Sequence, residues 1–92
     1  MSRMDELTTL CRVIEAKSFS RAAETLGLTQ PAVSMQIKAL EEAYGAELLH
    51  RSGFEILPTE VGRLVYEYAC QILRLYEESQ QQVQSLSGRL AG

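Results

Sequence analysis

The segment from residue 59 to residue 87 constrains the fold more than any other part of this 92-residue chain. It contains no proline, and it has no glycine between residues 63 and 87, so nothing after its first turn is a strong helix breaker. A helix of about 28 residues is roughly 40 Å long at 1.5 Å per residue. Its apolar side chains repeat at helical spacing along one stripe, namely Val61, Leu64, Val65, Tyr68, Ile72, Leu75, Tyr76, Val83 and Leu86.

The remainder of the chain is too small to cover so long a stripe. The part beyond about Tyr68 therefore needs a partner, and a second copy of the same helix is the simplest one. Ser87-Gly88 and Ala91-Gly92 are interpreted as the start of a hinge. Seven side chains are predicted to form the dimerisation surface, namely Leu64, Val65, Tyr68, Ile72, Leu75, Tyr76 and Val83.

The first 58 residues read as three short helices followed by a hairpin. The first helix covers about residues 2–17, and the second follows Ser20, a favourable N-cap, and ends at Gly27. The third covers about residues 29–45, with a capping threonine and a proline that the first helical turn tolerates. Two short apolar runs within residues 47–58 flank a glycine turn and predict two strands.

Residues 19–38 have the spacing of a helix-turn-helix. Ala23 lets two helices cross closely, Gly27 allows a tight turn, and Val33 anchors the second helix. A small helical protein can carry this pattern by chance. The exposed face of the third helix therefore has to show whether the motif binds DNA. That face has no acidic residue before Glu41. Its amide and hydroxyl side chains suit base edges, and its first turn offers free amides to a phosphate.

The charge distribution supports the same interpretation although the net charge is −3. Residues 17–38 carry three basic residues and one acidic residue, a local charge of +2. Residues 39–58 carry four glutamates and one arginine, a local charge of −3. A phosphate responds to the local field, so one face can attract DNA. The low total charge predicts weak non-specific affinity, and specific binding then depends on dimerisation and base contacts.

Other classes of function find little support in the sequence. The only histidine, His50, has no cysteine or carboxylate cluster beside it, so we expect neither a metal site nor an enzyme. Cys11 and Cys70 lie on apolar helix faces and are expected to be buried thiols. Apolar runs are too short to span a bilayer, and no secretory signal precedes the first helix. A cytoplasmic protein without a membrane partner is therefore expected.

Many positions in register resemble the N-terminal domain of LysR-type transcriptional regulators. They are Ser18-Phe19-Ser20-Arg21-Ala22-Ala23, Leu26, Thr29-Gln30-Pro31-Ala32-Val33-Ser34, Gln36-Ile37, Leu40-Glu41, Gly45, Leu48-Leu49, Arg51, Leu57, Thr59 and Gly62. The resemblance implies a mainly α fold, a winged helix-turn-helix of three helices and a two-stranded wing, followed by a long linker helix that dimerises. The implied domains are residues 1–58, with the helix-turn-helix at 19–38, and residues 59–92.

The resemblance also implies roles for individual residues. The helix from Thr29 enters the major groove of double-stranded DNA, and Arg51 in the wing faces the minor groove or a nearby phosphate. Phe54 departs from the family, whose wing often has a basic residue there, and Leu49 replaces a usual phenylalanine. The DNA-binding residues predicted in this way are Thr29, Gln30, Pro31, Ala32, Ser34, Met35, Lys38, Arg51, Gly53 and Phe54.

The function predicted is therefore sequence-specific regulation of transcription by a homodimer on a pseudo-palindromic operator. Family members are longer and carry a C-terminal domain that binds a small-molecule effector, so no cofactor is expected in this chain. The resemblance also allows a tetramer and a contact with RNA polymerase. Two alternatives stay open: a protein–protein interaction module that uses only the long helix, and another winged-helix family with different regulation.

Overall fold

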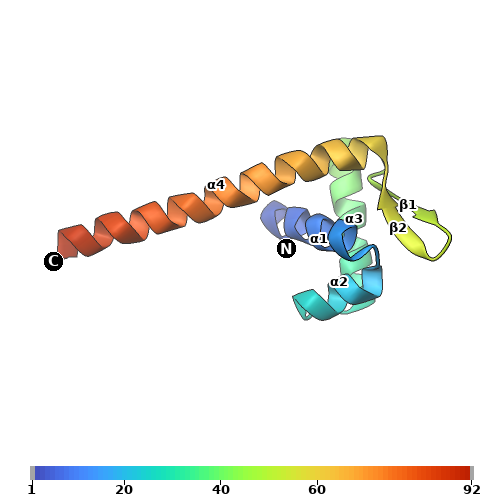
Figure 1. Ribbon diagram of the computed structural model, residues 1–92, viewed down its shortest axis with the longest axis horizontal. Helices are drawn as coiled ribbons and strands as arrows, with labels where there is room; N and C mark the ends of the chain where they lie inside the picture. Colours follow the sequence, from blue (N-terminus) through green and yellow to red (C-terminus); the bar gives the residue numbers. More distant parts are fainter. Residues whose placement is uncertain (1, 92) are drawn as a thin grey trace.

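The structure, a computed structural model, describes residues 2–91 as a small body from which one long helix projects (Figure 1). Its extents are 56 × 25 × 20 Å. The long helix crosses the body, continues well beyond it and carries the C-terminus at its far end (Figure 1). The elements in chain order are α1 (Arg3–Ala16), α2 (Phe19–Leu26), α3 (Gln30–Tyr44), β1 (Leu49–Ser52), β2 (Glu55–Pro58) and α4 (Glu60–Ala91).

Side-chain caps determine where α1 and α2 begin. Ser2 and Asp5 form a reciprocal capping box at the start of α1, as their spacing predicts. The cap of α2 is Ser18, whose hydroxyl accepts a hydrogen bond from the amide of Arg21 at 3.1 Å. The prediction that Ser20 caps this helix is therefore wrong. Ser18 takes the cap because its backbone is extended and its hydroxyl reaches the amide three residues on.

The turn between α2 and α3 is the short one that a helix-turn-helix requires. Gly27 ends α2 in the left-handed conformation, with φ 67°, which glycine adopts without a steric penalty. Thr29 then caps α3 by accepting a hydrogen bond from the amide of Ala32 at 3.2 Å. Ala23 and Val33 are both buried, as expected for the residues that bring the two helices together.

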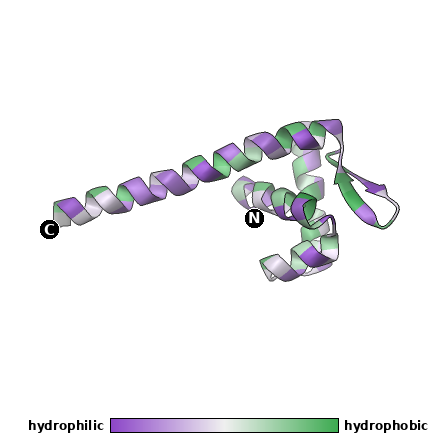
Figure 2. Ribbon diagram, viewed as in Figure 1, coloured by the Kyte–Doolittle hydropathy of each residue, from purple (hydrophilic) through white to green (hydrophobic). Residues whose placement is uncertain are grey.

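The core lies where α1, α2 and α3 meet the underside of α4 and the base of the hairpin (Figure 2). Leu10, Leu40 and Leu48 are fully buried within it. A buried hydrogen bond also crosses it, from the hydroxyl of Thr9 in α1 to Oε1 of Gln36 in α3, at 2.7 Å. This bond fixes the position of α3 against α1, because an unpaired amide would be costly at this depth.

Tyr44 continues the helical spacing of Ile37 and Leu40, and Cys70 is expected to be a buried thiol, but both side chains are exposed. Tyr44 is 46% exposed in the last turn of α3. Cys70 is also exposed, although Cys11 is buried as predicted. Cys70 follows Ala69, which faces the core, and one residue further round the helix its side chain reaches solvent.

The first turns of α4 have two apolar faces instead of one. Val65 is only 5% exposed, and with Ala69 it packs against the body. The assignment of Val65 to the dimerisation surface is therefore wrong. Val65 is three residues after Gly62 and four residues before Ala69, so the three residues share the side of α4 that faces the body. The neighbouring Leu64 points outward.

The far end of α4 also differs from the sequence prediction. The helix continues through Ser87-Gly88 to Ala91, so no hinge begins at Ser87. A single glycine inside a helix costs only about 1 kcal/mol, which is too little to break one whose neighbours favour it. Residue 92 lies outside the described residues. Within residues 2–91, none of the helices is long and apolar enough to cross a membrane.

Candidate nucleic-acid interface

The outward face of α3 carries the side chains that the sequence predicts for base contacts. Val33, Ile37 and Leu40 point into the core, so the opposite side of the helix is free. Met35 is 73% exposed on that side, although it is apolar. The other predicted residues of α3 are exposed with it except for the half-buried Ala32, and these are Gln30, Pro31, Ser34 and Lys38.

The first turn of α3 combines free backbone amides with two oriented side chains. The oxygen of Thr29 accepts the hydrogen bond from Ala32, and its own O–H remains free to donate to an anion. The hydroxyl of Ser20 in α2 donates to Oε1 of Gln30 at 3.4 Å. This contact orients the Gln30 amide and still leaves it a second lone pair and both N–H groups. Sequence reasoning missed this role of Ser20 because it placed the residue at a helix cap.

The register of the hairpin brings Arg51 to the start of α3. Arg51 lies directly opposite Ile56 in the antiparallel pair, and residues opposite one another share a face of the sheet. Because Ile56 is buried, this face turns toward the body. A groove of about 160 Å³ results, and it is lined by Ser18, Phe19, Ser20, Gln30, Arg51, Phe54 and Ile56. The groove thus joins α2, α3 and the wing.

Hydrogen bonds at its base hold the wing in place. The amide of Ile56 donates to the carbonyl of Lys17, in the turn after α1, at 3.0 Å. The amide of Thr59 donates to the carbonyl of Leu48 at 3.0 Å. The hydroxyl of Thr59 donates to the carbonyl of Glu47 at 2.7 Å. The hairpin therefore leaves the body at a fixed angle, while its tip projects away from it (Figure 1).

The cations near this interface have no carboxylate partner. Among residues 2–91, the ion pairs are Arg3–Glu6 and Arg12–Glu15 in α1 and Arg74–Glu78 in α4. The interface therefore keeps basic side chains outside ion pairs, although Glu15 and Glu55 line a hollow with Lys17 and Arg21. Its unpaired basic residues are Lys17, Arg21, Lys38 and Arg51.

Glu41, the first acidic residue after the DNA-facing part of α3, already accepts a hydrogen bond within the domain. Glu41 is half-buried, and its Oε2 accepts a hydrogen bond from the amide of Leu48 at 2.8 Å. It therefore supports the base of the wing and does not oppose a phosphate at the start of the helix. Its role is structural, in the connection between α3 and β1.

Groups with strongly shifted pKa values lie elsewhere, between α1 and α4. Burial, with the neighbouring Cys70 thiol, raises the pKa of Cys11 to about 12. Tyr66 donates a hydrogen bond to Glu15 at 2.9 Å, and this bond, with burial, raises the pKa of Tyr66 above its ordinary value. Residues 2–91 also contain no group of three or more His, Cys, Asp or Glu side chains placed to hold a metal ion.

Comparison with known proteins places the chain in a family. Residues 4–63 match the model of the bacterial regulatory helix-turn-helix proteins of the lysR family. The chain belongs to this family. A regulator of transcription from Allochromatium vinosum, the RuBisCO operon transcriptional regulator, is 43% identical over 81 residues, which are 84% of this chain and 27% of that protein. The regulator CysL of Bacillus subtilis is 39% identical over 79 residues, 86% of this chain and 26% of that protein.

Solved structures of lysR-family domains have the same fold. The DNA-binding domain of BenM, in complex with a benA site, gives a TM-score of 0.88 at 31% identity, covering 95% of this chain and 97% of that one. The DNA-binding domain of CbnR, in complex with DNA, gives 0.87 at 32% identity, covering 95% and 99%. Both comparisons confirm the predicted fold class, a winged helix-turn-helix followed by a long helix.

Membership of the lysR family also confirms the predicted class of function, a DNA-binding regulator of transcription. A regulatory helix-turn-helix domain is a binding module and not an enzyme. The chain spans about a quarter of the length of the first two curated relatives. What the whole protein binds and regulates therefore belongs to the proposals below.

Proposed function

We propose that two copies of this lysR-family domain bind one pseudo-palindromic site in double-stranded DNA. The observation that carries the proposal is the groove that brings Gln30 of α3 together with Arg51 of the wing, a basic side chain outside the ion pairs of the described residues. The similar domains of BenM and CbnR were solved on DNA, which supports the same ligand for this chain. In the proposed complex α3 lies in the major groove, whose width of about 12 Å admits a helix.

Each predicted contact has a distinct chemical role in this proposal. Gln30 pairs with adenine, which offers one acceptor and one donor in the major groove. Ser34 and Met35 face neighbouring base edges from the next turn of α3. Thr29 and Lys38 bind phosphates on either side of the groove. The remaining residues of the proposed interface are Pro31, Ala32, Arg51, Gly53 and Phe54.

The outward stripe of α4 is the proposed dimerisation surface. Leu64 and Tyr68 are more than half exposed in its first turns, on the side away from the body. Further along, α4 has no part of the body beside it (Figure 2), so its apolar residues stay in water unless another chain covers them. A second copy presents the same stripe and buries both at once. Val65 is left out because it is buried against the body. The residues proposed for the dimerisation surface are Leu64, Tyr68, Ile72, Leu75, Tyr76 and Val83.

The relatives from Allochromatium vinosum and Bacillus subtilis extend well beyond the quarter of their length that this chain matches, and a protein of that length could contain further domains. We propose that in such a protein an effector-binding domain follows α4 and senses a small molecule, as the family resemblance implies. Tetramer formation and contact with RNA polymerase would belong to that longer protein. Its place of action would be the cytoplasm, where a bacterial chromosome lies.

The test is selection of bound sequences from a randomised duplex pool, followed by anisotropy titration of the selected site at several salt concentrations. The expected result is enrichment of an inverted repeat with half-sites about one helical turn apart, or a multiple of it. Gln30→Ala should relax the preference at one position of each half-site, by about 1–3 kcal/mol. If the folded, dimeric protein enriches no sequence and binds without salt dependence, the interaction module that uses only α4 becomes the better hypothesis.

Arg51→Gln tests the wing separately. Loss of one phosphate contact should weaken binding to all sequences and make the salt dependence shallower by about one unit per protomer. Arg74→Gln is the matched control, because it removes the same charge from an exposed arginine on α4 that already has an acidic partner. Equal effects of the two substitutions would mean that only net charge matters, and the assignment of Arg51 to the interface would then be wrong.

A further inference from the structure

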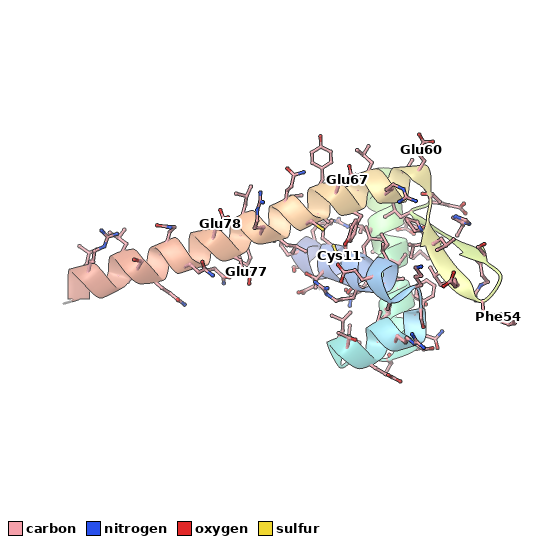
Figure 3. The ribbon with its side chains drawn as sticks, viewed as in Figure 1. Cys11, Phe54, Glu60, Glu67, Glu77 and Glu78 are labelled. Carbon is pink, nitrogen blue, oxygen red and sulfur yellow. The ribbon has the colours of Figure 1, made fainter. Side chains whose placement is uncertain are left out.

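Phe54 is a fully exposed aromatic side chain at the tip of the wing (Figure 3). It makes no contribution to the core, so folding does not explain an aromatic residue at this position. A single exposed apolar residue is common on protein surfaces and would mean nothing alone. Its position in a rigid turn and the charges on both sides of it are the informative observations.

The turn gives Phe54 little freedom to move away from its position. Strand pairing continues to Ser52 and Glu55, so the loop contains only Gly53 and Phe54. Gly53 has φ 62°, and a glycine with positive φ at the first loop position is the arrangement of a type II′ hairpin turn. The hydrogen bond from Ile56 to Lys17 holds the base of the hairpin. The ring is therefore presented at a fixed distance from the body.

Unpaired basic residues lie on both sides of the ring. Phe54 lines the groove that contains Gln30 and Arg51, and it also lines a second hollow with Lys17 and Arg21. Two acidic residues, Glu15 and Glu55, line this second hollow as well. Glu15 is occupied by its contacts with Arg12 and Tyr66. Glu55 lies opposite Ser52, and this pair alternates with the Arg51–Ile56 pair, so Glu55 faces away from Arg51 and toward the second hollow, where it offsets part of the charge of Lys17 and Arg21.

An apolar ring with Arg51 on one side and with Lys17 and Arg21 on the other is complementary to a groove of duplex DNA, in which two phosphate rims flank the base edges. With α3 in one major groove, the groove across the adjacent backbone is the minor groove. Its width of about 6 Å excludes a hairpin but admits a flat side chain. Apolar wedges of this kind, phenylalanine among them, enter minor grooves and partly unstack a base step.

We propose that Phe54 inserts into the minor groove beside each half-site and makes binding depend on how easily the base step there deforms. This inference rests on the proposed function, which places α3 in the major groove. Pyrimidine–purine steps such as TA and CA unstack most easily, so they should be favoured at that position. The wing then reads DNA flexibility with Phe54, while α3 reads base edges.

The experiment compares the wild-type protein with Phe54→Ser and Phe54→Leu. All three should have the same thermal stability, because Phe54 has no buried contacts in the chain. In parallel selections all three should enrich the same half-sites. Only the wild type and Phe54→Leu, which keeps an apolar wedge, should enrich pyrimidine–purine steps in the flanks. On the wild-type site Phe54→Ser should bind about ten-fold more weakly, within the range for loss of one aromatic contact to a base.

A fluorescent base analogue at the flanking step gives an independent readout. With 2-aminopurine there, the wild-type protein should raise the fluorescence by unstacking the base, and Phe54→Ser should not. Identical flank preferences and fluorescence for the wild type and Phe54→Ser would overturn the wedge. Equal weakening on every flank would also overturn it, since Phe54 would then be a non-specific contact. Absence of any shared half-site in all three selections would instead refute the proposed function.

Discussion

Gly62→Ala should destabilise this domain strongly, although alanine is the better helix former. Gly62 lies in the first turn of α4, where its amide donates to the hydroxyl of Thr59 at 2.9 Å. A Cβ at this position would lie 1.8 Å from the carbonyl oxygen and 2.8 Å from the carbonyl carbon of Leu48. Ordinary contact begins at 3.4 Å, so α4 and Leu48 would have to separate by about 1.6 Å.

Leu48 cannot move by itself to relieve this contact. Its carbonyl accepts the hydrogen bond from Thr59, its amide donates to Glu41, and its side chain is fully buried. The helix must therefore move away from the body, and that movement opens the contacts of Val65 and Ala69 with the core. Overpacking typically costs about 1–3 kcal/mol, and a contact with fixed backbone should exceed that range.

The net effect combines this penalty with the helix propensity of alanine. Replacing glycine inside a helix is worth about 1 kcal/mol in the opposite direction. We therefore expect a net loss of about 2–3 kcal/mol in the free energy of unfolding. For a domain of this size such a loss lowers Tm by roughly 10–20 °C.

Thermal unfolding followed by far-ultraviolet circular dichroism measures this effect, and Gly88→Ala is the matched control. Both glycines lie in α4, but a Cβ at Gly88 would meet no atom within 4 Å. Gly88→Ala should leave the Tm of the body unchanged or raise it slightly. A Gly62→Ala protein that melts within a few degrees of the wild type would refute the close approach of α4 to Leu48. Equal losses for both substitutions would show that packing at Gly62 is not the cause.

Four further predictions concern the core, the thiols and the projecting helix. Thr9→Val should lower the free energy of unfolding by about 1–3 kcal/mol in a denaturant titration, because it leaves Oε1 of Gln36 buried without a donor; an unchanged midpoint would contradict this. A thiol reagent should modify Cys70 in the native protein and Cys11 only after unfolding. Because the pKa of Cys11 is raised from 9.0 to about 12, its stabilising effect should be complete below pH 9 and decline as the pH rises toward 12; constant stability across that window would refute it. Tyr68→Arg should weaken dimerisation at least ten-fold in sedimentation experiments, whereas Gln81→Arg, on the opposite side of α4, should not; equal effects would exclude the proposed stripe.

Local signals were sufficient for most of the secondary structure. Capping residues, glycines with positive φ and apolar periodicity are properties of neighbouring residues, so they predict helix ends without knowledge of the fold. Because these signals are local, they also led to two wrong predictions, the cap of α2 and the hinge at Ser87. Two serines, Ser18 and Ser20, lie near the start of α2, and only the backbone conformation of Ser18 decides which of them caps it. The glycine at position 88 predicted a hinge, but the residues on both sides of it favour a helix and outweigh its effect.

The faces of α4 could not be separated from the sequence, because apolar residues cover much of its circumference near the body. Both Leu64 and Val65 fit a helical stripe, and the pattern does not say which of them meets the core. Gly62 decides it, since its lack of a side chain lets that side approach Leu48. A glycine in the first turn of a long helix is the signal that could have assigned Val65 to the core.

The interface combines local and non-local information in the same way. The acid-free face of α3 is readable from its own residues, whereas the neighbourhood of Gln30 and Arg51 depends on the register of the hairpin. The contact between Ser20 and Gln30 depends on the angle between α2 and α3. Neither follows from the sequence pattern of one element. The resemblance to the lysR family predicts that α3 and the wing lie on one side of the domain, because members of the family share the fold. The role of each residue stays a prediction.

The two faces of α4 have a consequence for how the proposed dimer would measure DNA. One face of its first turns packs on the body through Val65 and Ala69, and the adjoining face, about 100° round the helix, carries Leu64 and Tyr68. The same rigid turns would therefore fix each recognition helix relative to the dimer axis, with no flexible linker between them. Spacing between half-sites should then be strict, because a longer or shorter spacer would require these packed turns to separate. Gly62→Ala, which loosens that packing, should broaden the accepted spacings in the selection experiment even at temperatures where the domain remains folded, whereas Gly88→Ala should not.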